Sequence, residues 1–291
     1  MKQAHATITK DRSRAIAALI TVSLFYVLLS VNARLLENGF QDLTQVYLRI
    51  MLGALVGFLV FRKHIQWKKY LTVPRTDWPG ILLMGVVGYG VVVATITIGV
   101  INTSLVNASI LYSTIHFFTY LYSLVVFRTK PKLYNLGLIL LSFWGVSIIV
   151  SKSIIPSLTH IGKGDLFVLL SAASGAWYVI GRQMVSNYLN NRELSVLVMS
   201  IAAISTGLFA LLWHETIMFS SFLQWDMLFG LAFGAALNVL ATTFENYGYK
   251  ILNAVFASQL LLFENVFALI IGLIMYQEDP TWFQLLGAGI V

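Results

Sequence analysis

The sequence contains no cysteine and few charged residues. The absence of cysteine excludes disulfides, thiolate metal sites and cysteine nucleophiles, and it says nothing about the compartment. Only 11% of the 291 residues are charged and 58% are hydrophobic, whereas a soluble globular protein carries roughly 25% charged residues. The patterns GxxxxGK[ST], HExxH and GxSxG are also absent. These absences favour a membrane protein without an ATP-binding P-loop or a common hydrolase motif.

Ten apolar runs divide the chain, and a membrane-spanning helix needs about 20 such residues. The last run has ten residues before the sequence ends at Val291. Ten residues are too few to cross a bilayer, so we expect the chain to be truncated within its tenth span. The runs are about 15–35, 43–61, 78–101, 105–127, 134–150, 165–187, 194–213, 225–249, 253–276 and one that begins at Trp282.

The basic residues fall mainly on one side of the predicted spans. With a cytoplasmic N-terminus, the cytoplasmic segments carry fifteen Lys and Arg residues and the outer segments carry three. The positive-inside rule therefore predicts a multi-pass protein of the cytoplasmic (inner) membrane with its N-terminus inside. The basic residues lie between apolar runs and form no long tract, so the net charge of +7 does not indicate a nucleic-acid partner.

Two sets of similar residues in the two halves of the chain match each other at a constant offset. Spacings of three, four and four put each stripe on one face of a helix. The same offset of 148 residues carries His116 onto Glu264. The repeat favours a retained first helix, although Val31-Asn32-Ala33 is also compatible with a signal-peptidase site. The stripes are Ser23, Tyr26, Ser30 and Arg34, and Ser171, Ser174, Tyr178 and Arg182.

The loops after the fourth and ninth runs match in length but differ in charge. Gly137 lies nine positions after Arg128 in FRTKPKLYNLG, and Gly287 lies nine positions after Glu278 in QEDPTWFQLLG. Five helices per repeat is an odd number, so the second repeat must enter the membrane upside down. Its loop then lies outside, where no excess of Lys and Arg is expected. We therefore predict two inverted five-helix repeats, 15–150 and 165–291, which form one transport domain.

These segments resemble the drug/metabolite transporter superfamily, EamA type, as two copies over nearly the whole chain. The resemblance is carried by YLRIMLGALVGFLVF with Arg49, SAASGAWYVIGRQMV with Trp177, and ENYGYKILNAVFASQLLLFENVFALIIGLIMYQE. The chain departs from the family pattern where Asn265 follows Glu264 in place of proline, and where His116 replaces a proline. The resemblance implies ten helices around a central cavity, and export or exchange of small metabolites, often amino-acid-like, without ATP.

Polar residues follow one face of the fourth run and fall within about a third of the helix circumference. They fit a cavity wall that offers hydrogen bonds to a solute, and interhelical hydrogen bonding in lipid is the alternative. This stripe is Ser109, Tyr112, Ser113, His116, Thr119, Tyr120 and Ser123. The predicted substrate-binding residues are Tyr26, Ser30, Ser109, Tyr112, Ser113, His116, Thr119, Tyr120, Trp177, Tyr178 and Asn238.

The ninth run contains a carboxyl group near its middle. Glu264 lies eleven residues beyond Asn253, roughly 16 Å along a continuous helix, near the centre of the hydrocarbon core. A carboxyl group there should be neutral, partnered or exposed to water. We predict coupling roles for Glu264, its counterpart His116, and Glu245. A structural hydrogen bond of Glu264, or an ion pair of Glu245 with Lys250, is the alternative.

Two further features of the spans favour structural roles. Arg49 lies less than two turns below the outer surface, so the sequence predicts an ion pair with Glu37 or Asp42. Gly230 and Gly234 form a small-xxx-small pattern, which predicts close packing of the eighth helix against its neighbours.

The sequence as a whole predicts an all-α polytopic membrane protein that acts as a gradient-driven or facilitative transporter. Its partners are the lipid bilayer and a small-molecule substrate, it needs no cofactor or metal, and a homodimer is compatible with the sequence. A membrane-embedded enzyme would need clustered catalytic groups, and His116 is the only histidine within a predicted span. A receptor or scaffold would need neither inverted repeats nor facing polar stripes.

Overall fold

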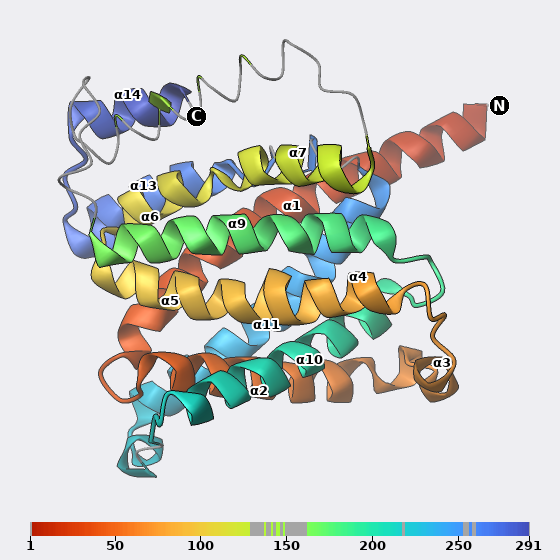
Figure 1. Ribbon diagram of the computed structural model, residues 1–291, viewed down its shortest axis with the longest axis horizontal. Coiled ribbons are helices and arrows are strands. Elements are labelled where there is room, and N and C mark those ends of the chain that lie inside the picture. The colour runs from red at the N-terminus through yellow and green to blue at the C-terminus, as the bar shows by residue number, and fades with distance from the viewer. Residues whose placement is uncertain are drawn as a thin grey trace.

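The computed structural model is a bundle of helices (Figure 1). It describes residues 2–128, 162–216, 219–252 and 260–290, with a few single positions between 137 and 257. No strand occurs among these residues. The helices are α1 (Lys2–Leu36), α2 (Asp42–Phe61), η1 (Arg62–His64), α3 (Trp67–Leu71), α4 (Trp78–Leu82), η2 (Leu83–Val91), α5 (Val92–Asn102), α6 (Leu105–Tyr112), α7 (Ile115–Val126), α9 (Lys163–Met184), α10 (Asn191–Leu212), η4 (Phe219–Leu223), α11 (Trp225–Ile251), α13 (Phe263–Tyr276) and α14 (Trp282–Ile290).

Seven helical segments of the described chain are long and apolar enough to cross a membrane. They coincide within a few residues with the predicted first to fourth and sixth to eighth spans, so the chain is an all-α polytopic membrane protein. The predicted fifth span, 134–150, lies almost wholly outside the described residues. The seven segments are Asp11–Leu36, Asp42–His64, Trp78–Asn102, Leu105–Val126, Lys163–Met184, Asn191–Leu212 and Trp225–Ile251.

Matching helices of the two halves run in opposite directions (Figure 1). The start of α2 meets the end of α10, where the Glu215 carboxylate accepts hydrogen bonds from the backbone N–H groups of Leu43 and Thr44, at 3.1 and 2.6 Å. The other ends of these helices also meet, because Glu193 at the start of α10 accepts from the N–H of Gln66 at 2.9 Å. Helices α1 and α9 are likewise antiparallel in Figure 1. The second repeat is therefore inverted relative to the first, as predicted.

The fourth and ninth predicted spans are not single helices. A turn at Ser113 and Thr114 separates α6 from α7, and a turn at Leu261 and Leu262 precedes α13. The Ser113 and Thr114 hydroxyls donate to the carbonyls of Ser109 and Leu111, and such side-chain bonds compete with a continuous helical ladder. Helices α7 and α13 begin 148 residues apart (263 − 115). The two breaks therefore obey the offset of the sequence repeat.

The second break corrects the predicted position of Glu264. The residue lies in the first turn of α13, and its N–H donates to the Leu261 carbonyl at 2.9 Å. A count along one continuous helix from Asn253 is therefore wrong, because the chain turns just before Glu264. The carboxyl group is nevertheless buried, with 8% of the residue exposed.

Helix α11 packs closely against α1 and α2 at two glycines. A Cβ atom at Gly230 would lie 2.9 Å from Leu36 Cδ2, and one at Gly234 would lie 2.7 Å from Arg49 Cδ. Both distances are below ordinary van der Waals contact, so a larger residue at either position would require the Leu36 or Arg49 side chain to shift. The predicted close packing is confirmed, and it holds the Arg49 side chain against α11.

Candidate functional site

A cavity of about 70 Å³ lies inside the bundle, and both halves of the chain contribute to its wall. The wall is built by α1, α2, η2, α5, α6, the start of α7, α9, α11 and the turn at the start of α13, with much of its surface apolar. Its polar groups are six hydroxyls, one amide, one guanidinium and two carboxyl groups. The polar lining residues are Tyr26, Ser30, Arg49, Tyr89, Thr97, Tyr112, Tyr178, Asn238, Glu245 and Glu264.

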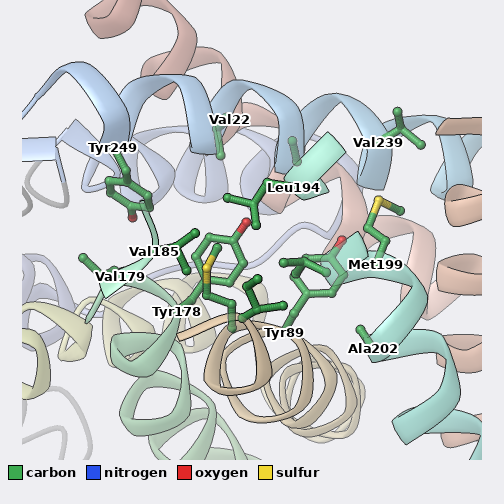
Figure 2. Close-up of a cluster of buried hydrophobic side chains, with 14 of the residues drawn as sticks. Val22, Tyr89, Tyr178, Val179, Val185, Leu194, Met199, Ala202, Val239 and Tyr249 are labelled. Carbon is green, nitrogen blue, oxygen red and sulfur yellow. The ribbon is translucent and has the colours of Figure 1, made fainter. Parts of the chain in front are cut away.

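Two tyrosines form an aromatic wall that is hydrogen-bonded to α11. The Tyr89 hydroxyl donates to Asn238 Oδ1 at 2.7 Å and accepts from the Thr242 hydroxyl at 3.2 Å. The Tyr178 hydroxyl donates to Asn246 Oδ1 at 3.2 Å. Figure 2 shows the two rings side by side with both hydroxyls directed toward α11, and their centroids are 6.2 Å apart. Tyr89 belongs to η2, a π-helical stretch, and such stretches are frequent at functional sites.

Glu245 and Glu264 face the tyrosine-lined part of the cavity. The hydroxyls of Tyr26 and Tyr249 approach the Glu245 carboxyl group, and Tyr112 lies within electrostatic reach of both carboxyl groups. No ion pair of the described residues includes Glu245, so the alternative pair with Lys250 is not formed. A carboxyl group in this setting is stabilised by protonation or by a cation.

The two helix breaks contact each other beside the cavity. The Asn265 side-chain amide donates to the Ser113 hydroxyl at 2.9 Å, which ties the start of α13 to the turn after α6. Glu264 occupies the first turn of α13, where the free N–H groups and the helix dipole favour a negative charge. The arrangement places an ionisable group and a helix N-terminus at the same point of the cavity wall.

Arg49 reaches from α2 to both α1 and α5. Its Nη2 donates to Thr97 Oγ1 at 2.9 Å, and its Nη1 lies 3.3 Å from the Leu29 carbonyl and 3.4 Å from Asn32 Oδ1. The residue is only 1% exposed, and its Nε has no hydrogen-bond partner. Every acceptor around the guanidinium is therefore a neutral oxygen.

The predicted ion pair of Arg49 with Glu37 or Asp42 is wrong, because no ion pair of the described residues includes Arg49. The side chain points into the bundle and not toward the loop between α1 and α2. Arg49, Tyr89 and Thr97 line the cavity but were not among the predicted binding residues. A cation within an apolar run was a signal for Arg49, whereas no sequence pattern marked Tyr89 or Thr97.

Seven of the predicted binding and coupling residues line the cavity, and they come from five different helices. They are Tyr26, Ser30, Tyr112, Tyr178, Asn238, Glu245 and Glu264. The remaining predicted residues lie outside its wall. These are Ser109, Ser113, His116, Thr119, Tyr120 and Trp177.

The stripe predicted on the fourth run does not form one wall of the cavity. The turn at Ser113 interrupts the helix, so residues before and after it no longer share one continuous face. Ser109 borders a smaller void that it shares with Glu264. No hydrogen bond of the described residues joins His116 to Glu264, and the buried His116 Nδ1 has no partner. Trp177 stacks on Tyr122, with centroids 4.4 Å apart.

Polar contacts join the helices at each of the two ends of the bundle, and the cavity lies between these ends. At the first end, here called the Arg34 end, Glu278 accepts from the N–H groups of Leu105 and Val106 at 2.8 and 3.0 Å. The same carboxylate lies 3.2 Å from Arg34 Nη1. At the opposite end, here called the Asp77 end, the Ser186 hydroxyl donates to Asp77 Oδ2 at 2.5 Å.

A second group of contacts at the Asp77 end surrounds Glu193. Its carboxylate lies 3.7 Å from Lys69 Nζ, and its backbone carbonyl accepts from the Tyr70 hydroxyl at 3.0 Å. Burial and the nearby Glu193 charge raise the pKa of Tyr70, so this hydroxyl stays protonated and remains a donor. Polar contacts between the two halves of the chain are thus present at both ends of the bundle.

The fold and the cavity define a class of protein: an α-helical membrane protein of two inverted halves that share one central site. Many secondary transporters have this architecture. The model of the EamA-like transporter family matches residues 13–151 and again residues 162–291. The chain belongs to the EamA-like transporter family.

One relative is itself named as a transporter, and one solved structure shares the fold. The uncharacterized transporter YcxC of Bacillus subtilis (strain 168) is 24% identical over 180 residues, which are 60% of this chain. The match covers 58% of the length of YcxC. A solved crystal structure matches with a TM-score of 0.63 and 14% identity, over 95% of this chain and 92% of that chain. At that identity the likeness describes the fold alone.

Proposed function

We propose that the protein is a secondary transporter that moves a small, amino-acid-like metabolite across the cytoplasmic membrane by export or exchange. The observation that carries the proposal is the pair of helix breaks, 148 residues apart, that meet beside a central cavity. Broken helices expose backbone groups and helix N-termini, and inside a membrane they are tolerated only where they line a cavity or are buried in protein.

Alternating access follows from the inverted halves. Opening the Arg34 end requires separation of Glu278 from Arg34 and from the start of α6, and opening the Asp77 end requires separation of Asp77 from Ser186. Because related halves supply these contacts, rocking one half against the other exposes the cavity to each side in turn. A gradient drives the cycle, and no enzymatic step is part of it.

The binding site in this proposal consists of the predicted residues that line the cavity. Tyr26, Ser30, Tyr112, Tyr178 and Asn238 contact the solute. Five further members of the predicted set do not line the cavity, and their role is to support the helices that form its wall: Ser109, Ser113, Thr119, Tyr120 and Trp177.

Glu264 and Glu245 form the coupling site. A proton on either carboxyl group changes the charge of the cavity, so it can favour one open state, provided that the two states bind the proton with different affinities. His116, the sequence counterpart of Glu264, lies in the equivalent first turn of α7. It is the third residue of the proposed coupling site.

The membrane orientation proposed from the loop charges puts the N-terminus and the Asp77 end in the cytoplasm, with the Arg34 end outside. The two repeats, 15–150 and 165–291, then form one transport unit. Association into a homodimer stays a prediction.

Flux in sealed proteoliposomes tests the function. Purified protein is reconstituted, and a panel of labelled amino acids, amines and neutral metabolites is followed with and without a pH gradient. The proposal expects saturable flux of at least one amino-acid-like solute without ATP. Absence of flux for the whole panel would contradict it, and would favour a receptor or scaffold.

A further inference from the structure

Arg49 carries a buried positive charge on the cavity wall, and no negative charge in the described part of the chain neutralises it. Its three acceptors are a hydroxyl, a carbonyl and an amide oxygen, whereas a guanidinium has five N–H donors. Two other cations that contact acidic groups, Arg34 and Lys69, lie at the ends of the bundle and pair with Glu278 and Glu193. A charge buried without a counterion is costly, so the Arg49 site is suited to receive an anion.

The surroundings of Arg49 fix the direction of its planar fork. The acceptors come from α1 and α5, the side chain packs against Gly234 of α11, and the residue lines the cavity together with Thr97. A guanidinium held in this way is preorganised, and its parallel N–H groups match the two oxygens of a carboxylate. The Nε–H has no hydrogen-bond partner, so the described residues do not satisfy all five donors of the guanidinium.

The same cavity contains groups suited to a cation. The Glu245 carboxyl group lies among the hydroxyls of Tyr26 and Tyr249, and Tyr178 is also near. Tyrosine rings and a carboxylate are a common setting for an ammonium group. The cavity therefore offers a site for each sign of charge.

We propose that Arg49 binds the carboxylate of the transported solute, which makes the substrate class a small zwitterion whose ammonium group faces Glu245. The inference rests on the proposed transport function and adds the residue and the charge that select the solute. A purely structural role, in which Arg49 only ties α1, α2 and α5 together, makes a different prediction: solute binding would not depend on a carboxylate.

The test on the wild-type protein compares matched solutes that differ only in the carboxyl group. The probes are L-leucine, L-phenylalanine and L-threonine, their amides, and the amines that lack the carboxyl group. Affinity is read from the concentration dependence of the thermal shift of purified protein. We expect at least one amino acid to bind, and its amide and amine to bind about 10- to 100-fold more weakly, as for the loss of a charge-assisted hydrogen bond.

Substitutions test whether Arg49 causes the preference for acids over amides. Arg49→Met should remove the preference for the acid over the amide. Arg49→Lys should retain only part of this preference, because an ammonium group lacks the planar fork. Thr97→Val, which removes the acceptor of Nη2, should weaken acid binding without removing the preference. Arg182→Met is the matched control, because Arg182 is also buried with an unpartnered Nε but does not line the cavity.

The outcomes separate this inference from the transport function. Equal binding of acids and amides, no binding of any acid, or an unchanged preference in Arg49→Met or Arg49→Lys would overturn the role of Arg49. If one of these results is obtained and amines or neutral solutes are nevertheless transported into proteoliposomes, the proposed transport function is still supported. Absence of flux for all three classes would instead refute the transport function.

Discussion

Gly88 lies where η2 packs against α9 beside the cavity, and its replacement by alanine tests this packing directly. A Cβ atom at this position would lie 2.5 Å from Tyr178 N, 2.6 Å from its Cα and 2.7 Å from its Cβ. Ordinary van der Waals contact begins at 3.4 Å, so η2 and α9 would have to separate by 0.9 Å (3.4 − 2.5). Backbone atoms cannot rotate away, and overpacking of this kind costs about 1–3 kcal/mol.

Gly57 provides the control for this substitution. A Cβ atom there would lie 3.4 Å from Val196 Cγ2, so alanine fits and gains at most about 1 kcal/mol of helix propensity. Unfolding of the detergent-purified variants, followed by tryptophan fluorescence, should rank Gly57→Ala at or above wild type and Gly88→Ala below it. Gly88→Ala should also slow flux, because the shift displaces the Tyr178 hydroxyl from Asn246. Equal or greater stability of Gly88→Ala relative to Gly57→Ala would refute the reasoning.

Three further predictions concern the carboxyl groups and the tyrosine wall. Glu264→Gln should fold normally but lose the pH dependence of flux in proteoliposomes, and an unchanged pH profile would make the carboxyl group structural. Glu278→Gln should weaken the contacts that close the Arg34 end by about 1–3 kcal/mol. When Ser30→Cys is introduced into this cysteine-free chain, an impermeant maleimide should react faster with Cys at position 30 in the Glu278→Gln variant. An unchanged rate would contradict this prediction. Tyr89→Phe leaves Asn238 without a donor and should lower the free energy of unfolding by about 1–3 kcal/mol, whereas a loss below about 0.5 kcal/mol would show that the hydrogen bond contributes little.

The membrane class and the inverted repeat were predictable because they depend on periodic and long-range features of the sequence. Apolar runs of the length of a bilayer have few alternatives to spanning helices. The stripe from Ser23 to Arg34 and its copy from Ser171 to Arg182 fixed the offset of 148 residues, and the same offset separates the starts of α7 and α13. Tyr26 and Tyr178, at equivalent places in the two stripes, both line the cavity.

The helix breaks were missed because a turn inside an apolar run leaves little trace in hydropathy. The break at Ser113 and Thr114 contains no glycine or proline. The hydroxyls of these two residues are equally compatible with a continuous helix. Once the helix is broken, later residues no longer share one face. The predicted stripe therefore divides, with Tyr112 on the cavity and His116 away from its wall.

The sequence by itself determined the membrane class, the approximate bounds of seven long apolar segments and the relation between the halves, because helical periodicity and hydrophobic length act locally. Only the tertiary structure decided which polar groups meet. Arg49 faces Thr97 of α5 and not Glu37 or Asp42 in its own neighbourhood of the chain. Tyr89 reaches Asn238, 149 residues away. Contacts of this kind depend on the angles and separations at which helices pack, and those are set by many side chains together.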